Sequence, residues 1–229
     1  MMTMFTFILA DAHLEPIPRK LWRHPSVRTW SKFRNKHPSK MILDQTLFYS
    51  AVRSDPELRE RGRVDILHRA LLTIIDSELC RSGHIRSIII HTIRNETYIV
   101  NPKTRPPRHY FRFLGLMEKL LAEGIIASPD GKILITKGEN IETIIKQERL
   151  EYIIGLSRRG NRVDLEEYIK EKTHTYSTIA FVVGAFPTGY FTEQTQRIID
   201  DLISIGEKTY TTSYVLCKII TTCERILQV

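Results

Sequence analysis

The sequence has few cysteines and no long apolar run. Its three cysteines, Cys80, Cys217 and Cys223, lack the close pairs and neighbouring histidines that zinc sites use. We therefore expect buried free thiols in a cytoplasmic protein, and no metal site. The longest apolar runs, such as residues 179–183, are far shorter than the roughly 20 residues of a membrane helix. These absences argue against a zinc-stabilised or membrane-spanning protein.

Signals for secretion and for hydrolysis are also missing. Residues 1–10 are apolar, but no basic segment precedes them, and Asp11 stands where a signal peptide needs small uncharged residues. We interpret this segment as a first β-strand. A hydrolase could use His13, His91 or His109, but no serine or cysteine occurs in a recognisable nucleophile elbow. A histidine-based hydrolase is therefore the least favoured functional class.

The composition is that of a folded protein with a polyanionic partner. Of 229 residues, 42% are hydrophobic and 26% charged, which suits one domain spanning residues 1–229. The formal net charge is +8. This charge favours a polyanionic partner and would also suit an acidic protein or an anionic membrane surface, so charge alone gives nucleic acid only a modest lead.

Apolar runs alternate with helical periodicity and predict an α/β protein. Strand-like runs rich in isoleucine and valine occupy residues 5–9, 87–91, 98–100, 152–154 and 179–183. Residues 64–79 and 113–121 place their apolar side chains on one helical stripe. We expect these helices to pack on the sheet.

Two segments differ from this α/β pattern. Residues 16–40 carry eight lysines and arginines among Trp22, Trp30 and Phe33, a mixture that suits RNA. An irregular surface excursion, anchored to the core by its tryptophans, needs the same residues and is an equal alternative. Residues 122–149 contain turn signals around short strands and are interpreted as a β-rich insertion.

Residues 101–113 form an unusual basic motif, which reads NPKTRPPRHYFRF. Pro107 suits the first turn of a helix, which would place Arg108 and Arg112 on one helical face with Arg105 just before it. Three guanidiniums near a helix N-terminus would favour phosphates. A solvated helix face is the alternative interpretation.

The C-terminal third contains three loops that could surround a ligand. An apolar strand runs into a loop with Gly184 and Gly189, where the absence of side chains would leave room for a ligand. A second strand ends in residues 154–157, and residues 205–212 read IGEKTYTT before an apolar helix that reaches Leu227. A glycine after a strand is weak evidence by itself, because any tight connection uses one.

These motifs together resemble the Nep1/Emg1 family of ribosomal RNA methyltransferases. The family signature is matched by NPKTRPPRHYFRFLGLM at 101–117, and similar segments occur at 9–12, 62–66, 75–77 and 89–92. The resemblance implies a SPOUT-type α/β fold with family-specific insertions, in which residues 150–229 form a deep trefoil knot that binds S-adenosylmethionine. The third loop departs from the family pattern, since it has Glu207 and Lys208 where smaller or neutral residues are usual.

The resemblance also implies roles for individual residues. Asp65 would hold Arg63 by a charge-assisted hydrogen bond, and the pair would recognise the target base, with the general base left open. Asp76 fits a structural cap or loop anchor better than a catalyst. The RNA-contacting arginines would be Arg63, Arg105, Arg108 and Arg112. The cofactor-binding positions would be Leu156, Gly184, Gly189, Ile205, Gly206, Glu207, Lys208, Thr209, Tyr210, Thr211 and Thr212.

The activity that the resemblance implies is methylation of N1 of a pseudouridine in small-subunit ribosomal RNA, as part of ribosome biogenesis. It further implies a homodimer, with ribosome assembly proteins as additional partners. The alternative is an RNA-binding assembly factor whose methylation is weak or secondary. The same basic surface would serve either protein, and cofactor binding separates them.

Overall fold

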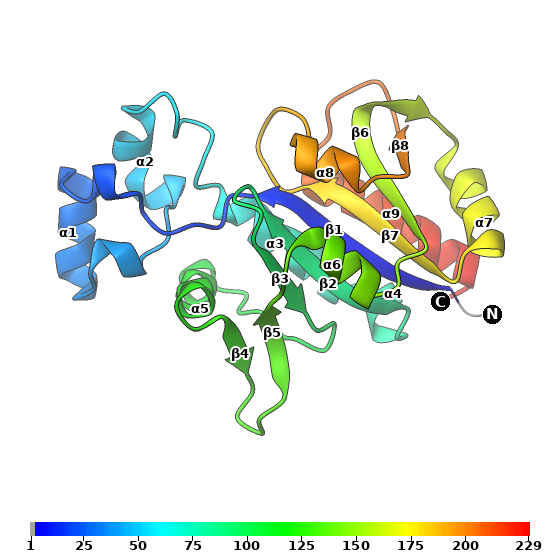
Figure 1. The fold of residues 1–229 in the computed structure, drawn as a ribbon, viewed down its shortest axis with the longest axis horizontal. Coiled ribbons are helices and arrows are strands. Elements are labelled where there is room, and N and C mark those ends of the chain that lie inside the picture. Colours follow the sequence, from blue (N-terminus) through cyan, green and yellow to red (C-terminus); the bar gives the residue numbers. More distant parts are fainter. Residues whose placement is uncertain (1–2) are drawn as a thin grey trace.

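The computed structural model describes residues 3–229, and within them one mixed sheet of eight strands runs through the molecule (Figure 1). The strand order is β4-β5-β3-β2-β1-β7-β6-β8. Five neighbouring strands are parallel to one another, namely β2, β1, β7, β6 and β8. Beyond β2 the sheet continues with β3, β5 and β4, each antiparallel to its neighbour. The strands are β1 (Met4–Ala12), β2 (Ile85–Thr92), β3 (Thr97–Val100), β4 (Ile125–Ala127), β5 (Ile133–Lys137), β6 (Tyr152–Arg162), β7 (Thr178–Gly184) and β8 (Asp201–Ser204).

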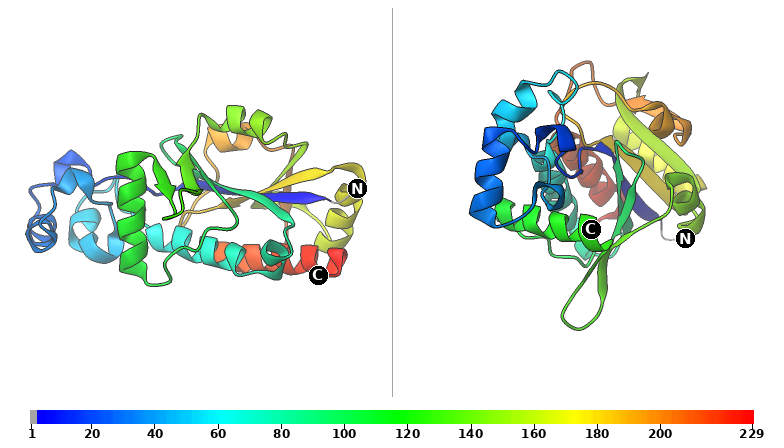
Figure 2. Two further views of the ribbon diagram at one scale, coloured as in Figure 1. Left: turned by 90° about the horizontal axis from the view of Figure 1, so that it is seen from below. Right: turned by 60° about the vertical axis from the view of Figure 1, so that its left-hand side comes forward.

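Helices cover both faces of the parallel part of the sheet (Figure 2). On one face α3 and α9 lie against each other, with α7 and α4 in contact with α9. The small helices α6 and α8 cover the opposite face. The helices are α1 (Pro25–Arg34), α2 (Gln45–Arg53), α3 (Val64–Ile75), α4 (Glu78–Arg81), α5 (Tyr110–Glu123), α6 (Ile141–Gln147), α7 (Leu165–Thr175), α8 (Glu193–Arg197) and α9 (Thr212–Leu227), with short 3-10 turns at Arg19–Leu21 and Pro38–Lys40.

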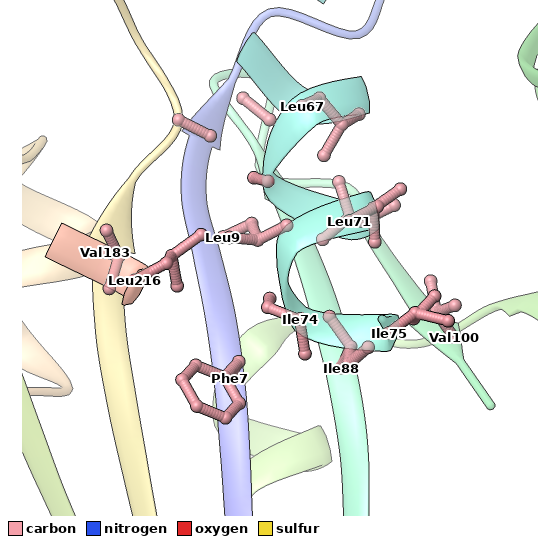
Figure 3. Close-up of a cluster of buried hydrophobic side chains, with 14 of the residues drawn as sticks. Phe7, Leu9, Leu67, Leu71, Ile74, Ile75, Ile88, Val100, Val183 and Leu216 are labelled. Atoms are coloured by element: carbon pink, nitrogen blue, oxygen red, sulfur yellow. The ribbon is translucent and has the colours of Figure 1, made fainter. Parts of the chain in front are cut away.

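The central strand β1 divides the core into two layers. Its alternate side chains point to opposite faces, so Phe7 and Leu9 join the layer beneath α3 and α9, whereas Ile8 and Ala10 join the layer beneath α6 and α8. A strand buried on both faces needs a continuous apolar run, which explains its sequence. Figure 3 shows how α3 packs against β1 and β2.

Helix α3 is shorter than the predicted 64–79. It ends at Ile75, and Asp76 follows as its C-cap. The Ser77 hydroxyl then accepts a hydrogen bond from the Cys80 amide and begins the separate helix α4. A serine in this role starts a new helix instead of continuing the old one. The predicted length was therefore wrong, although the apolar stripe of Leu67, Leu71 and Ile74 is fully buried.

Residues 16–62 form a helical lobe beside the sheet, which the sequence did not predict (Figure 1). Its helices α1 and α2 enclose a small apolar core of their own, built on residues such as Leu43 and Phe48. Trp22 and Trp30 pack against this core, and the Trp22 indole donates to the Ile17 carbonyl oxygen at 2.8 Å. The tryptophans of segment 16–40 are thus anchors, whatever its basic residues do.

Three further features differ from or extend the expectations. Residues 122–149 form the hairpin β4–β5, which lies at the sheet edge, and also the unpredicted helix α6. Cys223 is buried and Cys80 half-buried, but Cys217 is exposed on α9, so the expectation of buried thiols was wrong for that residue. Among residues 3–229 no helix has the length and apolarity to cross a bilayer.

Candidate active site

The carboxyl ends of β6, β7 and β8 surround a cavity of about 580 Å³. The sheet brings these ends together because the three strands are parallel. In open α/β sheets, ligands bind outside the carboxyl ends of the strands. The volume lies within the range of sites for drug-sized ligands and cofactors.

Three loop regions that the sequence singled out meet at this cavity. They are residues 156–158, the connection after β7, and residues 205–211 after β8. The predicted strand end at residues 154–157 was wrong, because β6 continues to Arg162 through an irregular pairing with β8 between Leu156 and Asn161. One predicted position differs: Glu207 does not line the cavity, and its exposed carboxylate pairs with Arg162 at 2.6 Å. The predicted positions that do line it are Leu156, Gly184, Gly189, Ile205, Gly206, Lys208, Thr209, Tyr210, Thr211 and Thr212.

Hydrogen bonds join these loops to one another and to β1. The Thr212 hydroxyl donates to the Gly184 carbonyl oxygen at 2.6 Å and fixes the start of α9 against the end of β7. The Ser204 hydroxyl donates to the Gly206 carbonyl oxygen at 2.7 Å. Thr192, which ends the connection after β7, is held by the buried carboxylate of Asp11. These hydrogen bonds therefore hold the cavity wall at three places, which are the start of α9, the loop after β8 and the end of the connection after β7.

The two loop glycines have structural reasons of their own beside the predicted one, which was room for a ligand. A Cβ atom on Gly184 would lie 2.7 Å from the Phe186 ring, so this glycine permits close packing within the wall. Gly189 has φ +105°, a conformation that side-chain-bearing residues rarely adopt, and a Cβ there would meet nothing within 4 Å. Gly184 thus permits close packing of the Phe186 ring, and Gly189 permits the left-handed backbone of the loop.

Helix α3 supplies a charged wall of the cavity through Arg63 and Arg69. The Arg63 guanidinium donates two hydrogen bonds to Asp65, Nε to Oδ1 at 2.7 Å and Nη2 to Oδ2 at 2.9 Å. Arg69 also donates to Asp65 Oδ2, at 2.9 Å. The predicted contact between Arg63 and Asp65 is thus present. The sequence did not predict that Arg69 shares the same carboxylate.

The surroundings of Asp65 decide which chemistry it suits. Burial alone would raise the pKa of its carboxyl, but the hydrogen bond and charge of Arg63, together with Arg69, outweigh burial and lower it. A carboxylate with a lowered pKa and two guanidinium partners accepts a proton poorly at neutral pH. The geometry therefore favours Asp65 as an orienting group for Arg63 over Asp65 as a general base.

The other three arginines predicted to contact RNA, Arg105, Arg108 and Arg112, lie in three different surroundings. Helix α5 begins at Tyr110, so Arg105 and Arg108 precede it, and the predicted helical face shared by Arg108 and Arg112 is wrong. A helix starting at Pro107 would use that residue's carbonyl oxygen for its own amides. Instead the oxygen is 2.8 Å from His68 Nε2 and bonded to it.

Arg108 is tied to the end of α3. Its two terminal nitrogens donate to the two carboxylate oxygens of Asp76, each at 2.9 Å. Asp76 is thus confirmed as a structural anchor. Arg112 is exposed on α5.

Arg105 lines a second cavity, of about 560 Å³, at the edge where β2, β3 and β5 meet. Arg81, Arg86 and Lys103 line it too, and Glu148 is its one acidic residue. Because Glu148 is already paired with Arg86 at 3.1 Å, the cavity keeps an excess of positive charge. Such a surface suits phosphate groups.

Some cavity residues were not predicted, because each lies one position beyond a segment that the sequence singled out. Tyr190 and Arg158 line the first cavity, and the Tyr190 hydroxyl accepts from Arg158 Nη2 at 2.6 Å. The three histidines considered for hydrolysis do not line it. Burial and the nearby charge of Arg61 lower the pKa of His13 to about 4. Across residues 3–229, no group of histidine, cysteine and carboxylate side chains could hold a metal ion.

The chain is similar to the proteins of one methyltransferase family in sequence and in structure. The model of the EMG1/NEP1 methyltransferase family matches residues 7–224. The ribosomal RNA small subunit methyltransferase Nep1 of Methanothrix thermoacetophila is 39% identical over 206 residues, which are 90% of this chain and 89% of that protein. Nep1 of Saccharolobus solfataricus is 36% identical over 223 residues, 96% of each chain. The crystal structure of Archaeoglobus fulgidus Nep1 bound to S-adenosylhomocysteine matches with a TM-score of 0.85 and 34% identity over the whole of both chains.

Proposed function

Because the chain belongs to the EMG1/NEP1 methyltransferase family, we propose that it uses S-adenosylmethionine to methylate N1 of a pseudouridine in small-subunit ribosomal RNA. The SPOUT-type knotted α/β fold expected from the sequence is confirmed by the match to a Nep1 crystal structure. Relatives named as small-subunit ribosomal RNA methyltransferases support the substrate class. The pseudouridine and its N1 atom rest on the motif resemblance.

The observation that carries this proposal is the cavity at the ends of β6, β7 and β8. Its residues fit an adenosyl cofactor, because Leu156, Phe186 and Ile205 offer apolar surface for a ring and the neighbouring threonines offer hydroxyl groups for polar atoms. The matching Nep1 structure has S-adenosylhomocysteine, the product that a methyl donor leaves behind. When bound here, S-adenosylmethionine would supply a methyl group activated on a sulfonium.

Arg63 and Arg69 connect the cofactor cavity to the RNA. Methyl transfer is an in-line displacement, so the protein's main task is to align the accepting nitrogen with the methyl group and exclude water. The N1 atom of pseudouridine carries a proton that must leave once the N–C bond forms. Arg63, oriented by Asp65, can stabilise negative charge that develops on a neighbouring base carbonyl. The N1 proton passes to solvent after the methyl group has left the sulfonium, when the methylated N1 is cationic and strongly acidic, so Asp65 does not have to accept it.

The remaining predicted residues extend the RNA-binding surface in this proposal. Arg105 brings phosphates to the second cavity, and Arg112 adds an exposed charge on α5. Two subunits would pair through the knotted region, so that the RNA surface spans both. We place the reaction in the cytoplasm during small-subunit assembly, where ribosome assembly proteins would be further partners.

Two synthetic RNA hairpins that differ at one nucleotide test the proposal. One carries pseudouridine at the target position and the other uridine, and mass spectrometry follows methyl incorporation. In uridine N1 is bonded to the ribose and has no proton to lose, so only the pseudouridine hairpin should be methylated at N1. Equal incorporation into both would show that a different atom is the acceptor.

A calorimetric titration with S-adenosylmethionine addresses the alternative of an assembly factor with weak or secondary methylation. Binding together with multiple turnovers on the pseudouridine hairpin supports the enzyme. RNA binding without cofactor binding would support the assembly factor instead.

A further inference from the structure

Four aromatic rings from two distant parts of the chain form a row on the surface. Phe33 stacks on Trp30 of α1, with ring centroids 5.2 Å apart and an interplanar angle of 29°. Trp30 lies 6.3 Å from Phe111 in the first turn of α5, and Phe111 lies 5.8 Å from His109. We call these four residues the aromatic platform.

The two phenylalanine rings of the platform have no role in the apolar core. Phe33 is 76% exposed and Phe111 48% exposed. Neither belongs to a hydrophobic cluster within residues 3–229, whereas Trp30 packs against the core of the helical lobe. Leaving neighbouring phenylalanines in water forgoes the free energy of burying them, and contiguous exposed apolar patches mark interaction sites.

The charged residues of α1 and of the first two turns of α5 are all basic. Helix α1 has three charged residues, all basic, and the first acidic residue of α5 is Glu118. Glu118 is buried and already accepts hydrogen bonds from Arg34 Nη2 at 3.1 Å and Lys36 Nζ at 2.6 Å. Arg28 and Lys32 on α1 and Arg112 on α5, the two helices that carry the phenylalanines, are exposed. Positive charge around flat apolar rings matches an RNA strand, which has phosphates outside and flat bases inside.

Two links hold the platform in a fixed shape. The contacts of Arg34 and Lys36 with Glu118 join the end of α1 to the middle of α5. The Tyr110 hydroxyl donates to the carboxylate of Asp44, which also caps α2 by accepting from the Thr46 amide at 2.7 Å. Because α1 and α5 are fixed before RNA binds, a base that stacks on the platform loses its own conformational freedom but does not have to order the protein.

Through Tyr110 the platform adjoins α3, the helix that forms the charged wall of the cofactor cavity. The Tyr110 and Phe111 rings are 6.2 Å apart. The Tyr110 ring in turn lies 5.6 Å from the ring of His68 on α3, the helix that supplies Arg63 and Arg69 to the cofactor cavity. A strand whose target base enters the cavity beside Arg63 can therefore pass over Tyr110 to the platform.

We propose that the aromatic platform stacks unpaired bases of the RNA strand next to the target nucleotide. This inference rests on the proposed function, because it takes RNA as the substrate. Stacking on Phe33 and Phe111 adds affinity without reading sequence, since every base has a flat face. It would bind the single-stranded flank of a loop while Arg63 and Asp65 recognise the target base.

The test compares Phe33→Ala and Phe111→Ala with Tyr49→Ala. Tyr49 is a matched control, because it is a 55% exposed aromatic residue of the same lobe, on α2, outside the platform. Fluorescence anisotropy measures the affinity for a pseudouridine hairpin with single-stranded flanks. Each platform variant should bind about 5- to 150-fold more weakly, the range that corresponds to loss of one base stack. Phe33→Trp should restore binding, and Tyr49→Ala should bind like the parent.

Abasic nucleotides identify the stacked bases. Each flanking nucleotide is replaced in turn by an abasic one, and the loss is measured with the parent and with Phe33→Ala. At the stacked position the abasic RNA should weaken binding to the parent but not weaken binding to the variant any further, because the same contact is already lost. The dependence of affinity on salt should remain unchanged in Phe33→Ala, since stacking releases no counterions.

The outcomes separate this inference from the proposed function. If the parent methylates the hairpin and the double variant Phe33→Ala, Phe111→Ala binds it equally well, the platform does not contact RNA. If that variant changes its oligomeric state in light scattering and keeps its RNA affinity, the rings form a protein interface, which also overturns the inference. Failure of the parent itself to bind cofactor or methylate the hairpin would refute the proposed function instead.

Discussion

The carboxylate of Asp11 accepts two hydrogen bonds from Thr192, one from the amide at 2.9 Å and one from the hydroxyl at 2.8 Å. Asp11 adds a third from the Thr195 hydroxyl at 2.9 Å, and it has φ +54° at the carboxyl end of β1. These bonds fix the far end of the loop that forms one wall of the cofactor cavity. A buried carboxylate in the central strand thus controls the shape of a wall formed about 180 residues later.

Replacing Asp11 should therefore weaken cofactor binding from outside the cavity. Asp11→Ala leaves two hydroxyls and an amide without their acceptor, so we expect the free energy of unfolding to fall by about 1–3 kcal/mol. Asp11→Asn is the matched control, because asparagine tolerates the left-handed conformation and keeps one acceptor oxygen. Denaturant unfolding and calorimetry should show a larger loss of stability and of cofactor affinity for alanine than for asparagine. Parental cofactor affinity in folded Asp11→Ala would disprove the link.

The loop glycines give a second prediction. Gly189→Ala should lower the free energy of unfolding by about 1–2 kcal/mol, the cost of a left-handed alanine, and it should also weaken cofactor binding because Gly189 lies in the cavity wall. Gly131→Ala is the control, since Gly131 has φ +81° and open space but lies in the β4–β5 hairpin. It should lose similar stability and keep cofactor affinity. Gly184→Val should abolish cofactor binding, because its side chain would displace Phe186.

The lowered pKa of Asp65 gives a prediction about pH. Because the folded state favours the ionised carboxylate, its contribution to stability is present above the ordinary aspartate pKa of about 3.9 and is lost as the pH falls through the lowered value. Asp65→Asn should therefore be less stable than the parent at neutral pH, and the difference should shrink in acid. Denaturant unfolding of both proteins, at neutral pH and in acid, measures this difference in the free energy of unfolding. A constant difference would mean that the two guanidiniums do not hold the carboxylate.

Asp65→Asn should also lower kcat/KM for the RNA hairpin by about 10- to 150-fold, the value of a charge-assisted hydrogen bond. Cofactor affinity should change little, because the loss concerns the orientation of Arg63. A large fall in cofactor affinity in this variant would place Asp65 at the cofactor instead of the RNA.

The arginines of the basic motif should differ in their effect on RNA binding. Arg105→Ala and Arg112→Ala should each lower affinity and reduce the slope of log affinity against log salt by about 0.7–0.9. Arg108→Ala should have a smaller effect, because Asp76 already neutralises that guanidinium. Arg197→Ala is the control, since Arg197 pairs with Glu193 on α8, which covers the opposite face of the sheet. An unchanged slope in the triple variant would place the RNA elsewhere.

The predicted homodimer is tested by light scattering. The resemblance implies that two subunits pair through residues 150–229, and Tyr214 of α9 in this region is 44% exposed and stacked on Tyr210 at 4.8 Å. We expect a dimer at micromolar concentration, and Tyr214→Asp should shift it toward the monomer by placing a charge in the interface. A fully active parental monomer would refute this prediction.

The sequence predicts the sheet well because the parallel strands are buried on both faces. Long runs of isoleucine, valine and phenylalanine leave few alternatives, so β1, β2 and β7 were found with ends shifted by one to three residues. Helix α6 was missed because only Ile141 and Ile144 are buried along its seven residues, and turn signals precede it. The spacing of apolar residues therefore gives little evidence for so short a helix.

The site was partly predictable for a similar reason. The cavity loops follow apolar strands and carry glycines, so a motif marks them. The surroundings of Arg108 and Glu207 depend on partners that are distant in sequence, Asp76 and Arg162. The aromatic platform depends on contact between α1 and α5, which no local pattern predicts.

The position of β1 at the centre of the sheet has a consequence for synthesis of the chain. One edge of β1 pairs with β2, but the other pairs with β7, in the register Met4 to Thr178. A ribosome adds about 5–20 residues per second, so the second edge waits on the order of ten to thirty seconds for its partner. During that time an apolar strand with phenylalanine at positions 5 and 7 has a free edge, which is an aggregation hazard. A chaperone that binds extended apolar segments should therefore associate with nascent chains that end before β7, and release them once β7 has emerged.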